Sequence, residues 1–292
     1  MNTTTELLER TLTLFPASVV KAEFVTSQRK KDLALTEIVR TYTEQNIKEF
    51  SINNFGVTKQ RVFLFNNPAG FNNARAHSYN LPNQFSSTIN GNCQIDTYIL
   101  KQRYKVVVMP TDLEPDFIIF VEFNQPFVIE IHNNYIILKL TMLEKNISSY
   151  LPNRIVYKAD REINDEAIVS EFKTTYANNL GQVLDPLDIN TGVKYLWNNN
   201  FIDAVSLRYK KQSSMATEVM DENFTFKNTY PLLFAQVMIA PLHNLTFKFI
   251  NNPNDTYCDF ACDPTCGTLS FHKYPKNLNQ IQNVVSEIIR NN

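Results

Sequence analysis

The sequence predicts an α+β fold in which antiparallel β-meander sheets are flanked by helices. Between residues 95 and 142, β-like runs follow one another with connections too short for a crossover, so neighbouring strands should be antiparallel. Amphipathic helical patterns open the chain at residues 3–15 and close it at residues 278–289. Beyond residue 152, helical patterns come first and strand-like runs follow. We therefore expect two α+β subdomains, residues 1–152 and 153–292, the second ending in the amphipathic helix.

Two helical patterns begin the chain. Thr3 and Glu6 have the spacing of a capping box, and apolar residues recur at helical intervals until Pro16 interrupts them. Residues 26–32 form a polar, basic link. A second helical pattern runs from residue 33 to about residue 50. These patterns predict two helices before the first strand.

The strands of the first subdomain come next. Residues 61–65 predict a strand, and the polar residues 66–92 predict a loop whose length is typical of a binding role or of disorder. Four β-like runs complete the meander, at residues 98–109, 117–123, 127–132 and 135–142. The central runs are apolar on both faces, which indicates that helices cover the sheet on at least one side.

The second subdomain begins with helices. Residues 164–166 have the sequence of a helix cap, and the helix that follows should close at Gly181. A short helix is predicted near residues 193–197. Strand-like runs follow at residues 201–210, 224–227, 245–250, 256–260 and 268–273. The last helix, residues 278–289, carries a single apolar stripe.

The composition argues against several classes of enzyme. With 292 residues, 43% of them hydrophobic and 20% charged, the chain is long enough to bury a large core. Its six glycines are isolated, so no GxGxxG, GxxxxGKS/T or GxSxG motif is present. Dinucleotide-binding, P-loop and α/β-hydrolase chemistry are therefore disfavoured. A net charge of -1 provides no global attraction to nucleic acid or to a membrane.

The expected compartment is the cytoplasm. The first residues lack the pattern of a signal peptide, and no apolar run reaches the roughly 18 residues needed to span a bilayer, so we expect no membrane partner. The abundance of asparagine is typical of an AT-rich coding genome, which favours a microbial or viral source. In a reducing cytosol the four cysteines should be free thiols or metal ligands rather than disulfides.

Three cysteines and a histidine form the only cluster of potential ligand side chains in the sequence. Residues 263–265 are typical of a turn, so residues 256–273 should form a hairpin with facing cysteines at its end. If the turn has three residues, alternation brings four side chains to one face, where they could bind Zn²⁺: Cys258, Cys262, Cys266 and His272. The alternatives are a Cys262–Cys266 disulfide, or packing of the thiols in the core with no cofactor.

Basic residues alternate along two strand-like runs. Lys101, Arg103 and Lys105 should share one face of their strand, and Arg208 and Lys210 one face of another. If the two strands are neighbours, they form a cationic surface able to follow a phosphate backbone. The basic loop would extend this surface with Arg29, Lys30 and Lys31. The alternative is the solvated polar face of an antiparallel sheet.

Carboxylates in the predicted meander allow a second functional hypothesis. Asp116, Glu122 and Glu130 fall at what are predicted to be successive strands, followed by Lys139. Divalent-metal phosphodiesterases use carboxylates to hold Mg²⁺ and a lysine to position the attacking water. Neither glutamate is followed two residues later by lysine, so the motif is incomplete.

The sequence favours a non-enzymatic binding protein that engages nucleic acid through the basic strand faces. One alternative is a divalent-metal-dependent phosphodiesterase or nuclease. Another is a structural or protein-interaction subunit of a larger assembly, in which the apolar stripe of the C-terminal helix contacts a second copy or a protein partner.

Overall fold

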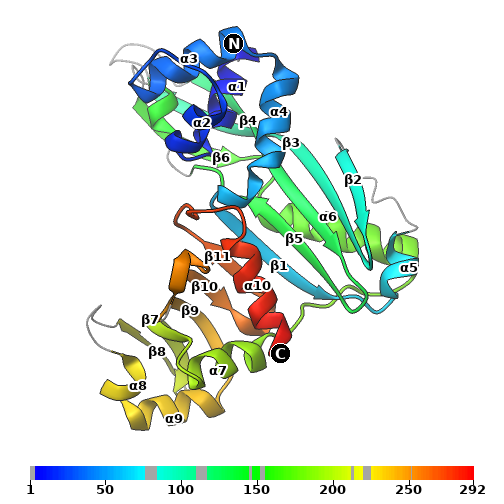
Figure 1. Cartoon of the computed structure of the whole chain (residues 1–292), viewed down its shortest axis with the longest axis vertical. Coiled ribbons are helices and arrows are strands. Elements are labelled where there is room, and N and C mark those ends of the chain that lie inside the picture. Colours follow the sequence, from blue (N-terminus) through cyan, green and yellow to red (C-terminus); the bar gives the residue numbers. More distant parts are fainter. Residues whose placement is uncertain are drawn as a thin grey trace.

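The protein forms one open antiparallel sheet with helices packed around it (Figure 1). The structure, a computed structural model, describes residues 4–75, 84–109, 117–144, 147–151, 155–211, 214–219, 225–250 and 252–292. Within these ranges there are eleven strands, ten α-helices and four short 3-10 turns. The α+β fold class predicted from the sequence is confirmed.

Strands from the whole length of the chain enter the same sheet. The strands before residue 152 are β1 (Gln60–Asn66), β2 (Gln84–Asn90), β3 (Cys93–Met109), β4 (Phe117–Ile131) and β5 (Tyr135–Thr141). Those after it are β6 (Ile155–Arg161), β7 (Ile202–Lys211), β8 (Ser214–Val219), β9 (Leu242–Phe249), β10 (Phe260–Asp263) and β11 (Thr268–Phe271). Their order is β2-β3-β4-β5-β1-β11-β10-β9-β7-β8, with β6 paired to the far end of β3. The subdomain boundary near residue 152 stays a prediction, and strands from both sides of it share one sheet.

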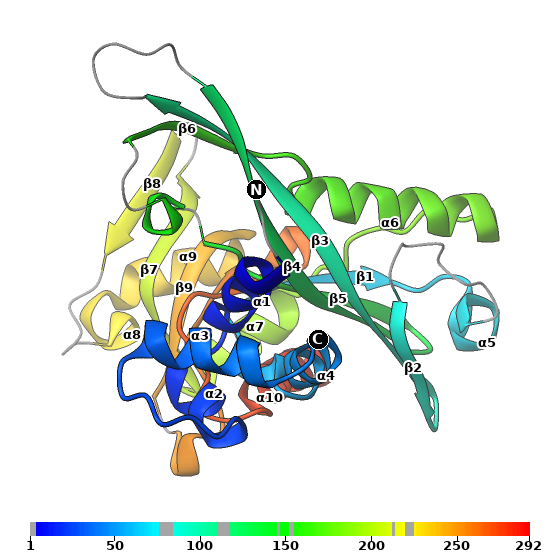
Figure 2. The same cartoon turned by 90° about the horizontal axis from the view of Figure 1, so that it is seen from above.

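The two halves of the sheet meet at β1. This strand pairs with β5 on one side and β11 on the other, so that Val62 lies opposite both Lys139 and Leu269. Alternate β1 side chains serve two cores: Phe63 and Phe65 pack toward the helix after β6, whereas Val62 packs toward the last helix of the chain. Helices therefore cover this part of the sheet on both faces (Figure 2).

Ten helices surround the sheet. Four of them form a bundle at the N-terminal end: α1 (Thr4–Thr13), α2 (Ala17–Glu23), α3 (Lys31–Thr41) and α4 (Glu44–Asn53). The others are α5 (Gly70–Arg75), α6 (Asp165–Leu180), α7 (Asn190–Asn198), α8 (Phe226–Thr229), α9 (Pro231–Ile239) and α10 (Gln280–Arg290). None of these described helices is both long and apolar enough to cross a membrane.

The N-terminal bundle differs from the two helices that the sequence predicts there in two ways: one predicted helix is divided in two, and one further helix is present. The helix expected over residues 33–50 divides into α3 and α4, because Thr43 caps α4 in a reciprocal pair of hydrogen bonds with Asn46. The helix α2 was not predicted. The capping box expected at Thr3 lies outside the described residues.

Helix α1 covers an open strand edge. Strand β5 pairs with β4 only from Phe127 onward, so among the described residues the first part of β4 has no strand neighbour on that side. Arg10 of α1 reaches this edge, where its Nε donates to the carbonyl of Glu122 at 2.7 Å. Its guanidinium also lies over the ring of Phe123, 5.9 Å from the centroid. The contact protects backbone groups that would otherwise invite pairing with another chain.

Three predictions for the first half of the sheet were wrong in detail. The runs predicted at residues 117–123 and 127–132 fall in one strand, β4, which ends at Ile131 and passes through Pro126 at a position where only β3 is paired to it. The range 66–92, predicted as a loop, contains α5 and β2, and its residues 76–83 lie outside those described. Strand β2 was not predicted because most of its side chains are exposed and polar, so its sequence has the pattern of a loop.

In the second half, the helix caps were predicted correctly. Asn164 accepts a hydrogen bond from the backbone of Ala167, and Gly181 ends α6 in the left-handed conformation. The strand predicted at residues 224–227 was wrong, because α8 begins at Phe226, and residue 224 lies outside the described residues. The run at residues 256–260 was also displaced, since β10 begins at Phe260.

The C-terminal helix was predicted correctly as an amphipathic helix, but its apolar stripe faces the chain's own core. Ile281, Val284, Val285 and Ile288 are each at most 2% exposed and pack against α7 and the second half of the sheet. Only the polar face of α10 is left for a partner.

Candidate functional site

The two basic rows that were predicted to form one cationic surface lie on strands far apart in the sheet. Lys101, Arg103 and Lys105 are exposed on one face of β3, as their alternation indicated. Six strands separate β3 from β7, which carries Arg208 and Lys210. At about 4.8 Å per strand the two rows are roughly 34 Å apart. The condition for one shared cationic surface, that the two strands are neighbours, is therefore not met, and the side chains of Arg208 and Lys210 lie outside those described.

Acidic residues accompany the basic row of β3. Lys101 Nζ lies 2.8 Å from Glu122 Oε2, and Arg103 Nε lies 2.8 Å from Glu162 Oε2. The Arg103 guanidinium also stacks over Phe120, 4.5 Å from the ring centroid. Ion pairs at the surface are weak, but because of them this face of β3 carries both negative and positive charges and is not purely cationic.

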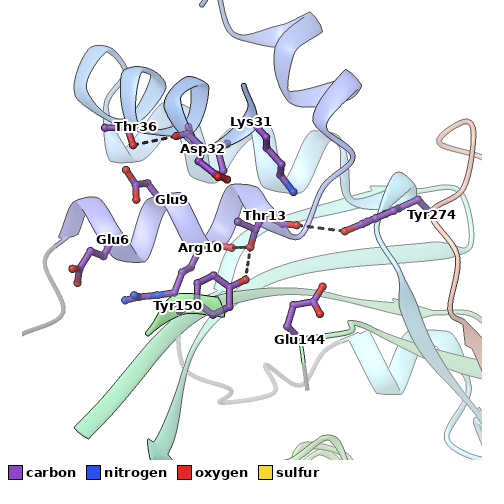
Figure 3. A pocket seen from close by; sticks show the side chains of 11 residues that line it. Glu6, Glu9, Arg10, Thr13, Lys31, Asp32, Thr36, Glu144, Tyr150 and Tyr274 are labelled. Atoms are coloured by element: carbon purple, nitrogen blue, oxygen red, sulfur yellow. Dashed lines mark hydrogen bonds between the residues drawn. The ribbon is translucent and has the colours of Figure 1, made fainter. Parts of the chain in front are cut away.

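The basic loop joins neither strand. Arg29, Lys30 and Lys31 are exposed beside the start of α3. Lys31 lines a pocket of about 550 Å³ in the N-terminal bundle (Figure 3). The pocket also contains four carboxylates and one buried arginine: Glu6, Glu9, Asp32, Glu144 and Arg10. Burial lowers the pKa of Arg10, an effect that the surrounding carboxylates oppose. The loop therefore meets an acidic surface within the chain.

The carboxylates of the nuclease hypothesis are not assembled. Asp116 lies outside the described residues. Glu122 and Glu130 were assigned to successive strands, but both belong to β4, eight positions apart, which is about 26 Å along the strand. One metal ion cannot bind both. Glu122 pairs with Lys101, whereas Glu130 is buried and pairs with Lys139.

The cysteine hairpin forms in a register different from the predicted one. Four residues, 264–267, connect β10 to β11, because a 3-10 turn is followed by Gly267 at a φ of +61°. Cys262 consequently pairs with Leu269, and Cys266 lies exposed in the turn. The changed register also places His272 on the opposite face of the sheet from Cys262. The predicted convergence of these side chains was wrong.

Two of the cysteines are core residues. Cys262 is 5% exposed, and Cys258 packs partly buried against the same cluster. Burial, assisted by Asp259, raises the pKa of Cys258 to about 12, and burial raises that of Cys262 well above its ordinary value. Both thiols thus stay protonated at neutral pH. Across the described ranges, no group of three or more His, Cys, Asp or Glu side chains is arranged to hold a metal ion.

A different polar cluster, which the sequence analysis missed, joins β3, β4 and β5. The Sγ of Cys93 lies 3.5 Å from Nε2 of His132, which lies 3.4 Å from Oε2 of Glu130. Lys139 donates to Glu130 and to Gln282 of α10. Cys93 and His132 meet because Gln94 pairs with Ile131, a register that the sequence pattern does not reveal.

This cluster is not arranged as a catalytic triad. Cys93 and Glu130 approach the same ring nitrogen of His132, so the imidazole cannot pass a proton from one to the other. Burial and the charge of Glu130 raise the pKa of Cys93 to about 11, against the opposing effect of Lys139. A nucleophilic cysteine requires a lowered pKa. The cluster therefore supports packing rather than nucleophilic catalysis.

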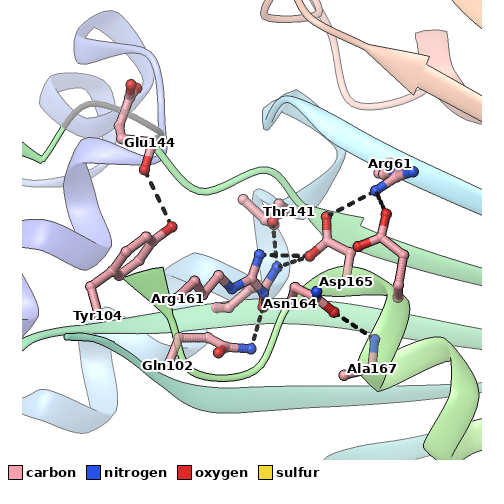
Figure 4. A network of polar contacts seen from close by, with 11 residues as sticks. Arg61, Gln102, Tyr104, Thr141, Glu144, Arg161, Asn164, Asp165 and Ala167 are labelled. Carbon is pink, nitrogen blue, oxygen red and sulfur yellow. Dashed lines mark hydrogen bonds and ion pairs between the residues drawn. The ribbon is translucent and has the colours of Figure 1, made fainter. Parts of the chain in front are cut away.

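A second network surrounds the start of α6 (Figure 4). Arg161 of β6 donates to Asp165 Oδ1 at 2.8 Å and to Gln125 Oε1 at 2.7 Å. Arg61 of β1 lies 2.5 Å from Glu166 Oε1 and 3.9 Å from Asp165 Oδ2. Both arginines line a pocket of about 560 Å³. The sequence analysis assigned residues 164–166 to helix capping alone.

Helix α9 exposes a strongly apolar face. Phe234 and Val237 anchor the helix in the core, where Phe234 packs edge-on against Trp197. On the other side, Leu232 and Ile239 are 82% and 86% exposed, seven positions apart and so on the same face. No charged residue occurs from position 228 to position 242. The signal that could have revealed this helix is Pro231 at its first position, ahead of an uncharged run.

Comparisons with protein-family models, with curated proteins and with solved structures found no match. The function is therefore inferred from the arrangement of the residues described above.

Proposed function

We propose that the chain is a structural subunit that assembles with copies of itself through the exposed, largely apolar face of α9, formed by Leu232, Ala235 and Ile239 around the uncharged Gln236. The observation that supports this proposal is the exposure of Leu232 and Ile239 on a helix without charges. Apart from Gln236, α9 is apolar all round, and a helix that is apolar all round is normally buried. One face of α9, with Phe234 and Val237, is buried within the chain, and the opposite face would become buried in an assembly.

A second copy is the occupant that the charge pattern favours. In a twofold interface both copies contribute the same patch, so a charge near the axis would meet its own copy, and a patch with charges of one sign would repel itself. An uncharged helix avoids that repulsion. Selective recognition of a different protein usually relies on complementary charges, which this face lacks.

The size of the face predicts a weak interaction. Burying Leu232 and Ile239 from both copies would contribute about 6–12 kcal/mol. Association itself costs roughly 4–15 kcal/mol. At most about 8 kcal/mol of net gain remains, so we expect a dissociation constant no lower than about 1 µM, and further contacts in a larger assembly would strengthen the interaction.

Sedimentation velocity over a concentration series tests the proposal. The native chain should shift from monomer to dimer between about 5 and 500 µM. A Leu232→Lys, Ile239→Lys variant should remain monomeric throughout, because two pairs of ammonium groups would face each other. A Val25→Lys, Val183→Lys variant is the matched control, since both valines are exposed on other parts of the chain, and it should dimerise like the native chain.

Two results would contradict the proposal. One is a native chain that stays monomeric at the highest concentration. The other is a chain that stays monomeric but pellets with phospholipid vesicles in a manner that depends on Leu232 and Ile239, since α9 would then be a lipid-binding face.

A further inference from the structure

The pocket near Arg61 forms where one strand of the sheet is shorter than its neighbours. Strand β5 ends at Thr141, whereas β3 and β6 continue beyond it. The space of about 560 Å³ that remains lies between β1 and β11 on one side and β3 and β6 on the other. Its volume is within the range of sites for small molecules, about 300–1,000 Å³.

The two walls of the pocket differ in character. On one wall, Arg61 pairs directly with Ser270 of β11, and His272, the first residue after that strand, also lines the pocket. On the other wall lie Tyr104 and Ala159. Figure 4 shows Arg161 and Asp165 between Tyr104 and Arg61. A ligand with a polar end and an apolar body would match this division.

The two arginines differ in how firmly they are held. The side chain of Arg161 is 14% exposed and is fixed by Asp165, itself 13% exposed, and by Gln125. Arg61 is 32% exposed, and its nearer partner, Glu166, is 61% exposed. An ion pair with so exposed a carboxylate is weak, so an incoming anion can displace Glu166. Because Arg161 already neutralises Asp165, the guanidinium of Arg61 is the positive charge that can bind an incoming anion.

We propose that this pocket binds the oxyanion of a small molecule, a phosphate or a carboxylate attached to an apolar or aromatic body. The oxyanion binds Arg61 beside Ser270 and His272, in the paired geometry that a guanidinium offers to such groups. The body of the ligand lies against Tyr104 and Ala159. This site is independent of the assembly face on α9, so either proposal can fail without the other.

Isothermal titration calorimetry of the native chain with three probes tests the site: inorganic phosphate, adenosine monophosphate and benzoate. Adenosine monophosphate and benzoate should bind more tightly than phosphate alone, because the apolar wall contributes. If adenosine monophosphate binds and benzoate does not, the group recognised is a phosphate, and the reverse result assigns a carboxylate. If none of the three binds, the proposal is wrong.

Two substitutions should act in opposite directions. Arg61→Gln should weaken binding at least about tenfold, because the charge-assisted hydrogen bonds are lost. Glu166→Gln should strengthen binding by about two- to fivefold, because it removes the carboxylate that competes for Arg61. Damage to the fold cannot produce tighter binding, so the second variant remains informative even if the first folds poorly.

The matched control is Arg103→Gln, which breaks an exposed arginine–glutamate pair outside the pocket. It should bind the probes as the native chain does. Equal binding by the native chain and Arg61→Gln, or weaker binding by Glu166→Gln, would overturn the assignment.

Discussion

At the scale of single residues, the buried pair of Glu130 and Lys139 is the most consequential charge arrangement. Their side chains are 9% and 8% exposed, and Lys139 also donates to Gln282 of α10. An unpaired buried charge costs several kcal/mol, so each partner depends on the other. The sequence pattern allows both residues in the alternative nuclease site, because a pattern of residue types does not distinguish a buried carboxylate from an exposed one.

This pair makes stability depend on pH. Burial alone would raise the pKa of Glu130, but Lys139 and hydrogen bonds from His132 and Lys139 outweigh it and hold that pKa at about 2, below the ordinary 4.5. A group with a lowered pKa in the folded state contributes stability above its unfolded pKa and loses it as the pH falls toward the folded value. We therefore expect Glu130 to stabilise the fold above pH 4.5 and to lose this contribution, on the order of 3 kcal/mol, between about pH 4.5 and 2.

Urea unfolding at several pH values, compared with Glu130→Gln, measures this effect. The native chain should lose more stability than the variant between pH 5 and pH 2.5. If both curves fall in parallel, the pair does not account for the acid sensitivity.

At the scale of elements, local chemistry was predicted well and register was not. The caps of α6 at Asn164 and Gly181 depend only on neighbouring residues, which the sequence displays. The facing partner of Cys262 depends on where the turn lies and on its length. The turn starts one residue later and is one residue longer than predicted, so Leu269 rather than Cys266 faces Cys262. The pocket at Arg61 was also beyond prediction, because it arises from the end of one strand relative to strands far away in the sequence.

Gly267 is the residue that sets this hairpin. Its φ is +61°, and a Cβ there would lie 2.6 Å from the carbonyl oxygen of Leu187 and 2.7 Å from that of Leu64. Neither backbone atom can move without opening the junction with β1. Gly91 has a similar φ of +60° with nothing within 4 Å of the added Cβ, which makes it the matched control.

We expect Gly267→Ala to lose about 3 kcal/mol or more in the free energy of unfolding, and Gly91→Ala only about 1 kcal/mol, the cost of the left-handed conformation. Chemical denaturation of both variants measures the difference. Equal losses would mean that the close approach to Leu64 and Leu187 costs nothing.

At the scale of the whole molecule, the strand order decides what the basic rows can do. The sheet places β3 and β7 far apart, and a net charge of -1 adds no general attraction for polyanions. Nucleic-acid binding therefore stays a prediction for β3 alone. Its three cations would make at most three phosphate contacts, two of them in competition with Glu122 and Glu162.

We expect any binding of labelled DNA or RNA to be weak, with a slope of log affinity against log salt no steeper than about -2 to -3. Exchanging Lys101, Arg103 and Lys105 together for glutamine should abolish it, whereas Lys48→Gln, which removes one cation from an exposed pair with Glu44, should not. Binding that survives the triple exchange, or a much steeper slope, would place the interface elsewhere.

The pairing of β1 with β11 has a consequence for synthesis on the ribosome. Val62 pairs with Leu269, a partner that emerges about 200 residues later. At roughly 5–20 residues per second, that edge of β1 waits about 10–40 s for its neighbour. During this interval an apolar strand with an open edge is exposed to aggregation, and the two halves of the sheet join only after β11, in the last quarter of the chain, has been made.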